Sequence, residues 1–148
     1  MTKDEKWMQI AINEAKLAMK ENEIPVGSVL VQNEKIIAKA HNQPIGNNDP
    51  TAHAEIQLLR RAGKEQENYR LGGSTLYVTL EPCQMCAGAM YWAQLSRLVY
   101  GASDPHRGFK VLGTKIHPKT KVTSGVMSKE SKLLIDAFFI KKRKEKQD

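Results

Sequence analysis

His53-Ala54-Glu55 and, about thirty residues later, Pro82-Cys83-Gln84-Met85-Cys86 are the stretches around which this chain is expected to fold. Two thiols three residues apart at the start of a helix point the same way, because positions i and i+3 are neighbours on one helical face. One imidazole added to them gives three ligands, the number that a catalytic zinc ion uses when its fourth position stays open for water. A structural zinc site would need a fourth ligand. His41, His106 and His117 could supply it, although none of them has comparable spacing.

Each of these motifs is weak when it is taken alone. A single Cys-x-x-Cys is also typical of a thioredoxin-like redox pair or of two buried small hydrophobic residues, and a single His is often a hydrogen-bonded core residue. The joint order, His-x-Glu and then Pro-Cys-x-x-Cys, favours one catalytic zinc ion per chain, held by His53, Cys83 and Cys86. Glu55 is then a spare carboxylate beside the metal.

His53 and Glu55 lie two residues apart, which is roughly 200° around a helix, so they cannot share one helical face. Both side chains reach one pocket only if that pocket straddles the first turn of the helix. We expect Asp49 or Thr51 to be the N-cap of this helix, with Pro50 in its first turn. The spacing also suits separate roles, in which His53 holds the metal and Glu55 contacts its water.

Composition sets the outer limits of the prediction. We expect residues 1–148 to form a single domain with a core of its own. The chain has 23 Lys and Arg against 16 Asp and Glu, and its net charge of +7 favours phosphate-rich partners. No stretch approaches the roughly 18 apolar residues of a membrane span, and residues 1–5 lack the apolar segment of a signal peptide. We therefore expect a cytoplasmic protein without a membrane partner.

Hydrophobic periodicity divides the chain into alternating elements. It predicts a helix over residues 4–21, strands over 28–31 and 35–40, a helix ending near 62, a strand over 74–79, a helix from the cysteines to about 95, strands over 98–102 and 121–123, and a helix over 129–144. This alternation indicates an α/β/α layered domain. It also places both thiols at a helix N-terminus, where exposed amides stabilise a thiolate.

Much of the chain closely resembles the bacterial tRNA-specific adenosine deaminases, which belong to the zinc-dependent cytidine and deoxycytidylate deaminase superfamily. The similar segments are residues 24–27, 49–56, 68–71, 75–90, 100–104 and 138–139 with the basic residues that follow. The resemblance implies a three-layer α/β/α cytidine-deaminase-like fold with a central mixed five-stranded sheet. It also implies a homodimer that converts the wobble adenosine of a tRNA anticodon stem-loop to inosine.

The resemblance further implies a hydrolytic mechanism. Zinc on His53, Cys83 and Cys86 lowers the pKa of its bound water towards ~7, so that hydroxide can attack adenine C6. Glu55 passes the water's proton to N1 and later protonates the leaving ammonia. Asn42 matches a position that hydrogen-bonds the flipped base, and Asp104 one that contacts the anticodon-loop backbone. Both residue types are otherwise ordinary turn formers.

Two alternatives remain open at this stage. Tyr91-Trp92-Ala93 is more similar to the guanine deaminases, which share the zinc motifs and act on the free base, and residues 105–121 differ from better-known tRNA enzymes. The third possibility is an inactive zinc module that only binds RNA, although an intact Glu55 beside an open metal position argues against it. The basic run at residues 141–146 suits phosphate contact, but such a run is often only a solvated helix face.

Overall fold

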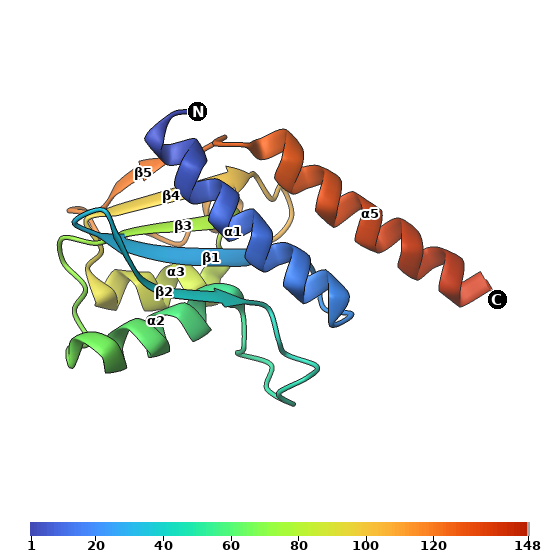
Figure 1. Ribbon diagram of the computed structural model, residues 1–148, viewed down its shortest axis with the longest axis horizontal. Coiled ribbons are helices and arrows are strands. Elements are labelled where there is room, and N and C mark those ends of the chain that lie inside the picture. The colour runs from blue at the N-terminus through green and yellow to red at the C-terminus, as the bar shows by residue number, and fades with distance from the viewer. Residues whose placement is uncertain (148) are drawn as a thin grey trace.

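A mixed sheet of five strands is the middle layer of the computed structural model, which describes residues 1–147 (Figure 1). The strands are β1 (Gly27–Gln32), β2 (Lys35–His41), β3 (Thr75–Leu80), β4 (Arg97–Ala102) and β5 (Lys121–Thr123). In the order β2-β1-β3-β4-β5, β1 pairs antiparallel with both β2 and β3, whereas β4 runs parallel to β3 and β5. All five strands predicted from periodicity are therefore present.

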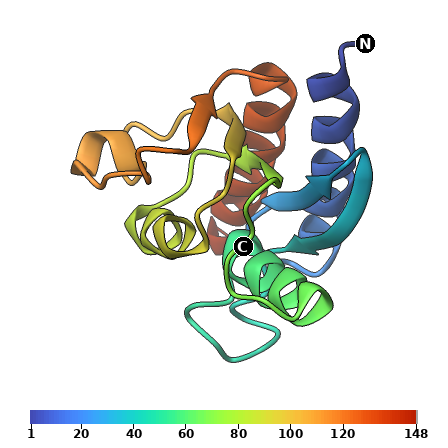
Figure 2. The same ribbon diagram turned by 90° about the vertical axis from the view of Figure 1, so that its left-hand side faces the viewer.

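Helices cover both faces of this sheet. The helix α1 (Lys3–Lys20) packs on β1 and β3, and α5 (Ser128–Gln147) packs on β4. On the opposite face, α2 (Ala54–Gln66) packs on β1 and β2 and contacts α3 (Gln84–Ala93). Figures 1 and 2 show the sheet between these two pairs of helices. The predicted three-layer α/β/α arrangement is confirmed.

The strands bury side chains on both faces, as expected for strands between two helical layers. Leu30, Leu76, Val78, Leu98 and Tyr100 are buried with residues of α2 and α3, whereas Val29, Tyr77 and Val99 are buried with residues of α1. Gly27, at the start of β1, lies directly against α1. A Cβ at this position would lie 2.0 Å from the backbone oxygen of Ala11, so only glycine lets α1 approach the sheet this closely.

The first helix begins with a capping box, in which two backbone amides are satisfied by side chains. The hydroxyl of Thr2 accepts the backbone N–H of Glu5 at 3.1 Å, and the carboxylate of Glu5 accepts the backbone N–H of Thr2 at 3.0 Å. The sequence also predicts an apolar stripe on this helix, and the stripe is buried at Met8, Ile12 and Ala15 and partly buried at Met19. One face of α1 is thereby fixed against the sheet.

The second helix begins later than the sequence predicts. Neither Asp49 nor Thr51 is its N-cap, because that position belongs to His53 and the helix starts at Ala54. The Oδ1 atom of Asp49 instead accepts the backbone N–H of Thr51 at 2.9 Å and its hydroxyl at 2.7 Å, which closes a turn before the helix. The later start places His53 immediately before the first turn and Glu55 within it. Both side chains can therefore reach one pocket, as expected.

Three further features differ from the prediction. The helix α2 ends at Gln66, beyond the predicted end near residue 62. The helix α3 ends at Ala93, before the predicted end near residue 95, because Gln94 adopts the left-handed conformation with φ of 54°. The short helix α4 (Phe109–Leu112) was not predicted. Four residues are too few to show a helical period in the sequence, since a single turn already takes about 3.6 residues.

The last helix, α5, has 20 residues, and its C-terminal part extends beyond the sheet (Figure 1). The basic run at residues 141–146 lies on this projecting part. Within residues 1–147, no helix is both long and apolar enough to cross a membrane.

Candidate active site

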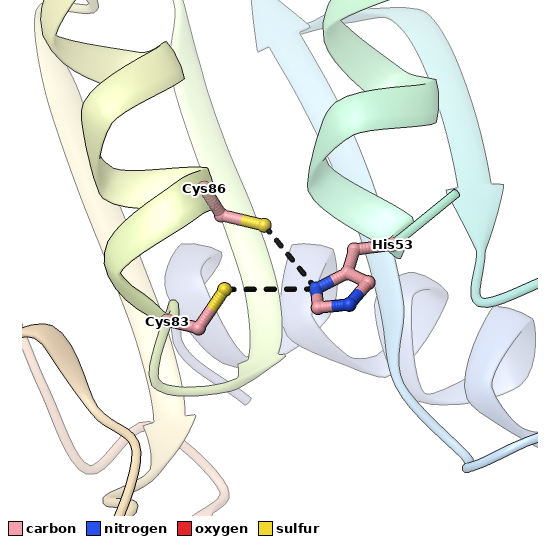
Figure 3. Close-up of side chains that lie close together, drawn as sticks. All are labelled: His53, Cys83 and Cys86. Atoms are coloured by element: carbon pink, nitrogen blue, oxygen red, sulfur yellow. Dashed lines mark hydrogen bonds between the residues drawn. The ribbon is translucent and has the colours of Figure 1, made fainter. Parts of the chain in front are cut away.

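Three potential metal ligands meet where α2 and α3 begin (Figure 3). His53 is the N-cap of α2, Cys83 is the N-cap of α3, and Cys86 lies in the first turn of α3. The Nδ1 atom of His53 is 3.6 Å from the Sγ atom of Cys83 and 3.6 Å from that of Cys86. Donor atoms bound at about 2.0–2.3 Å to one tetrahedral zinc ion lie about 3.3–3.8 Å apart, so this donor set fits zinc.

The cluster leaves one coordination position open. Within residues 1–147, no fourth His, Cys, Asp or Glu ligand atom belongs to it. Three protein ligands with a fourth position free for water are typical of a catalytic zinc site, whereas a structural site is closed by a fourth ligand. Cys83 and Cys86 are free thiols and do not form a disulfide. The arrangement therefore favours the catalytic metal site over the redox pair.

The environment of Cys83 favours its thiolate form. A hydrogen bond with the Cys86 side chain lowers the pKa of Cys83 to about 4, and the nearby His53 acts in the same direction. The same contact between the thiols raises the pKa of Cys86, and the hydrogen bond with Cys83 raises the pKa of His53. Cys83 is therefore a thiolate at neutral pH, which is the form that binds zinc.

Glu55 lies in the first turn of α2, with 4% of its surface exposed. Burial raises the pKa of Glu55 to about 7, because the charged carboxylate loses its hydration. The residue lines the same cavity as His53 and Cys83 but is not part of the ligand cluster. A carboxyl group beside a metal site that is not itself a ligand can exchange protons with a bound water.

The metal ligands open onto a cavity of about 670 Å³. Five of the six predicted site residues line it, namely Asn42, His53, Glu55, Cys83 and Asp104. The sixth, Cys86, is fully buried beside them. A volume of this size lies within the roughly 300–1,000 Å³ of typical small-molecule sites, so it can receive a nucleobase.

Asn42 has a structural role that the sequence did not reveal. Its Oδ1 atom accepts the backbone N–H of Ala54 at 2.7 Å and thereby caps the start of α2, in place of a side-chain bond from His53. The oxygen therefore already accepts one hydrogen bond, and its second lone pair can accept one more. The side-chain NH₂ group remains to donate to a molecule in the cavity.

Asp104 lies at the rim of the cavity in the loop that follows β4. Its Oδ1 atom accepts the backbone N–H groups of His106 and Arg107, each at 3.0 Å. These bonds make Asp104 a turn-forming residue, as its place before proline suggests. His106 and Arg107 also line the cavity, so the turn gathers polar groups at its mouth.

Sequence analysis missed one wall of the cavity, which belongs to α5. Lys132, Ile135, Asp136 and Phe139 line the cavity, and Lys132 Nζ forms an ion pair of 2.7 Å with Asp136 Oδ2. Their spacing of three, four and seven residues places them on one helical face, which could have been read from the sequence. Only the packing of α5 on β4 shows that this face borders the site.

Two buried glutamates were also missed. Glu23 is 2% exposed, and its carboxylate accepts the backbone N–H groups of Ile45 and Gly46 at 3.1 Å and 2.7 Å. Glu81 is 5% exposed and lines the cavity. Glutamate is rarely buried, and nothing local distinguishes these two from the exposed glutamates of the chain. Each carboxylate accepts hydrogen bonds from backbone N–H groups in a segment beside the site.

The sequence of this chain is similar to those of known proteins. Residues 1–102 match the family described as the cytidine and deoxycytidylate deaminase zinc-binding region. The tRNA-specific adenosine deaminase of Haemophilus influenzae is 46% identical over 153 residues, which cover 97% of this chain and 87% of that protein. The similarity therefore includes the parts of the chain beyond the zinc motifs.

Two solved structures allow a comparison of the fold. One, from a study of A-to-I editing by tRNA:A34 deaminases at the wobble position of transfer RNA, has a TM-score of 0.82 and 40% identity, over 87% of this chain and 98% of that one. The other is a guanine deaminase from Bacillus subtilis, with a TM-score of 0.65 and 38% identity, over 70% of this chain and 66% of that one. The predicted cytidine-deaminase-like fold is confirmed, and the first structure matches more completely.

Proposed function

The chain belongs to the tRNA-specific adenosine deaminases, zinc-dependent hydrolases of the cytidine and deoxycytidylate deaminase family, and we propose that it converts the wobble adenosine of a tRNA anticodon to inosine. One zinc ion per chain is its cofactor. The observation that carries the proposal is the meeting of three metal ligands with the buried carboxyl group of Glu55 in one cavity. Water and adenosine enter the reaction, and inosine and ammonia leave it.

The chain's own residues divide the work of this reaction. His53, Cys83 and Cys86 would hold one zinc ion, which would lower the pKa of a bound water to ~7. Glu55 takes a proton from this water and gives it to adenine N1 as the water oxygen adds to C6. The same carboxyl group then carries the second proton of the water to the departing ammonia.

Two further residues are proposed to bind the substrate. The free side-chain NH₂ group of Asn42 donates a hydrogen bond to the purine in the cavity, while its oxygen accepts the N–H of Ala54. The Oδ2 atom of Asp104 accepts a hydrogen bond from a ribose 2′-hydroxyl of the anticodon-loop backbone at the rim. The target base must leave its stack to reach the zinc ligands, since they lie inside the molecule.

Guanine deamination is the second candidate function, and the position of the aromatic pair weakens it. Tyr91 and Trp92 do not line the cavity. Tyr91 packs instead against His117, with ring centroids 5.0 Å apart, and Trp92 is 71% exposed. The two residues that resemble a guanine deaminase therefore have no contact with the proposed base site, and a free-base enzyme has no need of the chain's net charge of +7.

Ammonia release by the zinc-loaded protein tests the proposal. An anticodon stem-loop with a wobble adenosine and free guanine are assayed in parallel, with Glu55→Ala as the control. We expect release from the stem-loop alone, and loss of this activity in Glu55→Ala without loss of zinc. Activity on guanine alone would replace the proposal with the second candidate, and an absence of release from both would favour an RNA-binding module.

We also propose that the protein acts as a homodimer. Trp92 is 71% exposed, Val111 is 58% exposed and Leu112 is 47% exposed, and they lie on the contacting helices α3 and α4. A cluster of exposed apolar side chains is typical of an interface, and we propose that these three side chains belong to one. A second copy would cover them, and a stem-loop would then contact a wider surface than one small domain offers.

The mass of the protein in solution tests the dimer. Light scattering should give twice the chain mass of 16.6 kDa for the wild type and the monomer mass for Trp92→Glu. Leu133→Glu is the matched control, because Leu133 is 59% exposed on α5, away from α3 and α4. A wild-type monomer, or an unchanged mass in Trp92→Glu, would count against this interface.

A further inference from the structure

We propose that Glu81 is a positioning residue that holds the rim of the cavity, the loop of residues 103–108, in the shape that binds the substrate. Glu81 follows the last residue of β3 and precedes Cys83 by two residues. It is 5% exposed and lines the cavity. The inference rests on the proposed function only in the choice of assay substrate.

Both carboxylate oxygens of Glu81 accept hydrogen bonds from backbone N–H groups in or next to this loop. Oε1 accepts the N–H of Asp104 at 3.0 Å, and Oε2 accepts the N–H of Lys110 at 3.1 Å. Lys110 is in the first turn of α4, whose N-cap, Gly108, has no side chain to satisfy the free amides. Glu81 therefore caps α4. It also joins the start of the loop, and the helix that follows the loop, to the end of β3.

The loop also packs directly on Glu81. A Cβ at Gly108 would lie 2.2 Å from the Oε2 atom of Glu81, so this position has no room for a side chain. The next residue, Phe109, donates its backbone N–H to the carbonyl of Pro82 at 2.9 Å. The loop is thus bonded to the chain segment that leads to Cys83, and its position follows that of Glu81.

A chain of hydrogen bonds connects Glu81 to the residues at the mouth of the cavity. Glu81 holds the backbone of Asp104, and the side chain of Asp104 holds the backbones of His106 and Arg107. Loss of the first bond frees these groups, whereas Glu55 and the zinc ligands keep their own supports. The expected effect is therefore on substrate binding, and the chemical step is spared.

Glu81→Gln tests this division with steady-state kinetics on the anticodon stem-loop. The variant keeps one side-chain oxygen, but its NH₂ group faces a backbone N–H, so one of the two bonds is lost. We expect KM to rise about ten-fold, with kcat within about two-fold of the wild type and zinc content unchanged. Glu65→Gln, the same change at an exposed site on α2, is the control. An unchanged KM, a fall in kcat alone, or loss of zinc would overturn the proposal.

Amide hydrogen exchange tests the same inference without a substrate. Residues 103–112 should exchange faster in Glu81→Gln than in the wild type, whereas residues 27–32 of β1 should not change. Equal exchange in residues 103–112 would overturn the inference. This result decides the role of Glu81 even if the wild type releases no ammonia from the stem-loop, in which case the proposed function fails by itself.

A second variant attacks the contact from the other side. Gly108→Ala places a methyl group against the carboxylate of Glu81 and should also raise KM. The methyl group would also lie 2.6 Å from the backbone oxygen of Asp104, but its main contact is the carboxylate that Glu81→Gln changes, so the two increases in KM should combine to less than their product. Effects that multiply in the double variant would show that the two residues act separately, contrary to the proposal.

Discussion

At the scale of single residues, the amide oxygen of Asn42 caps a helix, and its NH₂ group is the one proposed to bind the substrate. Its oxygen caps α2, the helix that begins next to His53 and carries Glu55. Its NH₂ group has the chemistry to donate to a base. A variant that removes the whole side chain would mix these two effects, so a variant that changes only the donor is needed.

Asn42→Asp separates capping from substrate binding. The carboxylate still accepts the N–H of Ala54, but it can no longer donate to the base and adds negative charge near Glu55. We expect a KM at least about ten-fold higher in Asn42→Asp, with a smaller loss of stability than in Asn42→Ala, which loses the cap and should lower the free energy of unfolding by about 1–2 kcal/mol. Asn13→Asp, on the exposed face of α1, is the control. Wild-type kinetics in Asn42→Asp would remove Asn42 from the substrate contacts.

The cysteine ligands are predicted to contribute to stability as well as to catalysis. Cys86→Ala removes one of three zinc ligands, so the zinc content should fall from about one per chain to near zero. A ligand present at 100 times its dissociation constant stabilises the folded state by about 2.7 kcal/mol, and the melting temperature should fall accordingly. A chelator should lower the melting temperature of the wild type and leave that of the variant unchanged. Metal analysis showing one zinc ion in Cys86→Ala would contradict the assignment.

At the scale of elements, α1 is joined to the sheet by a charged pair as well as by apolar packing. The guanidinium of Arg97 donates two hydrogen bonds to the carboxylate of Asp4, at 2.8 Å and 2.7 Å, and Tyr77 donates a third at 2.8 Å. The bonds from Arg97 hold the pKa of Asp4 below its usual range. The side chain of Asp4 is 24% exposed and that of Arg97 is 32% exposed, so water screens this ion pair only in part.

Asp4→Asn should therefore destabilise the protein in a pH-dependent way. The folded-state pKa of Asp4 is depressed, so its contribution is full above the unfolded pKa, about 4, and is lost as the pH falls through the folded pKa. At pH 7 the variant should lose about 1–2 kcal/mol of unfolding free energy, and the difference should shrink below pH 4. Denaturant unfolding at several pH values measures this. Asp136→Asn, in the exposed pair with Lys132, should cost under about 0.5 kcal/mol, and an equal loss in both would refute the account.

The elements were predictable where a pattern repeats, and their ends were less so. The stripe of α1 and the apolar strands show their period within a few residues. The start of α2 depends on Asn42, which is twelve residues away from Ala54 in the loop that follows β2. The cap of α4 depends on Glu81, which is twenty-nine residues away from Lys110. Helix boundaries set by such distant partners leave no local sequence signal.

At the scale of the whole molecule, the walls of the site follow from strand pairing. Leu80 of β3 pairs with Ala102 of β4 in parallel register, so the chain segments after both strands lie at the same edge of the sheet. Glu81 and Asp104 meet for this reason. The metal motifs could be read from the sequence because their chemistry is confined to a few residue types. The places of residues 103–108 and of α5 beside the site could be predicted only from the order of the strands in the sheet.

Charge on the projecting end of α5 gives a prediction for the whole molecule. Lys141, Arg143 and Lys144 are exposed, whereas Lys142 is 3.5 Å from Glu145 and lies over the Phe138 ring. If Lys141, Arg143 and Lys144, three of the four exposed cations of the run, contact phosphates, changing them to Gln should reduce the slope of log affinity against log salt by about 2–3 for an anticodon stem-loop. Fluorescence anisotropy at several salt concentrations measures the slope. A matched variant removes three exposed charges elsewhere, by changing Lys16, Lys20 and Lys35 to Gln. The control should keep the wild-type slope. Equal slopes in the two variants would mean that net charge alone explains the binding and that residues 141–146 are a solvated helix face.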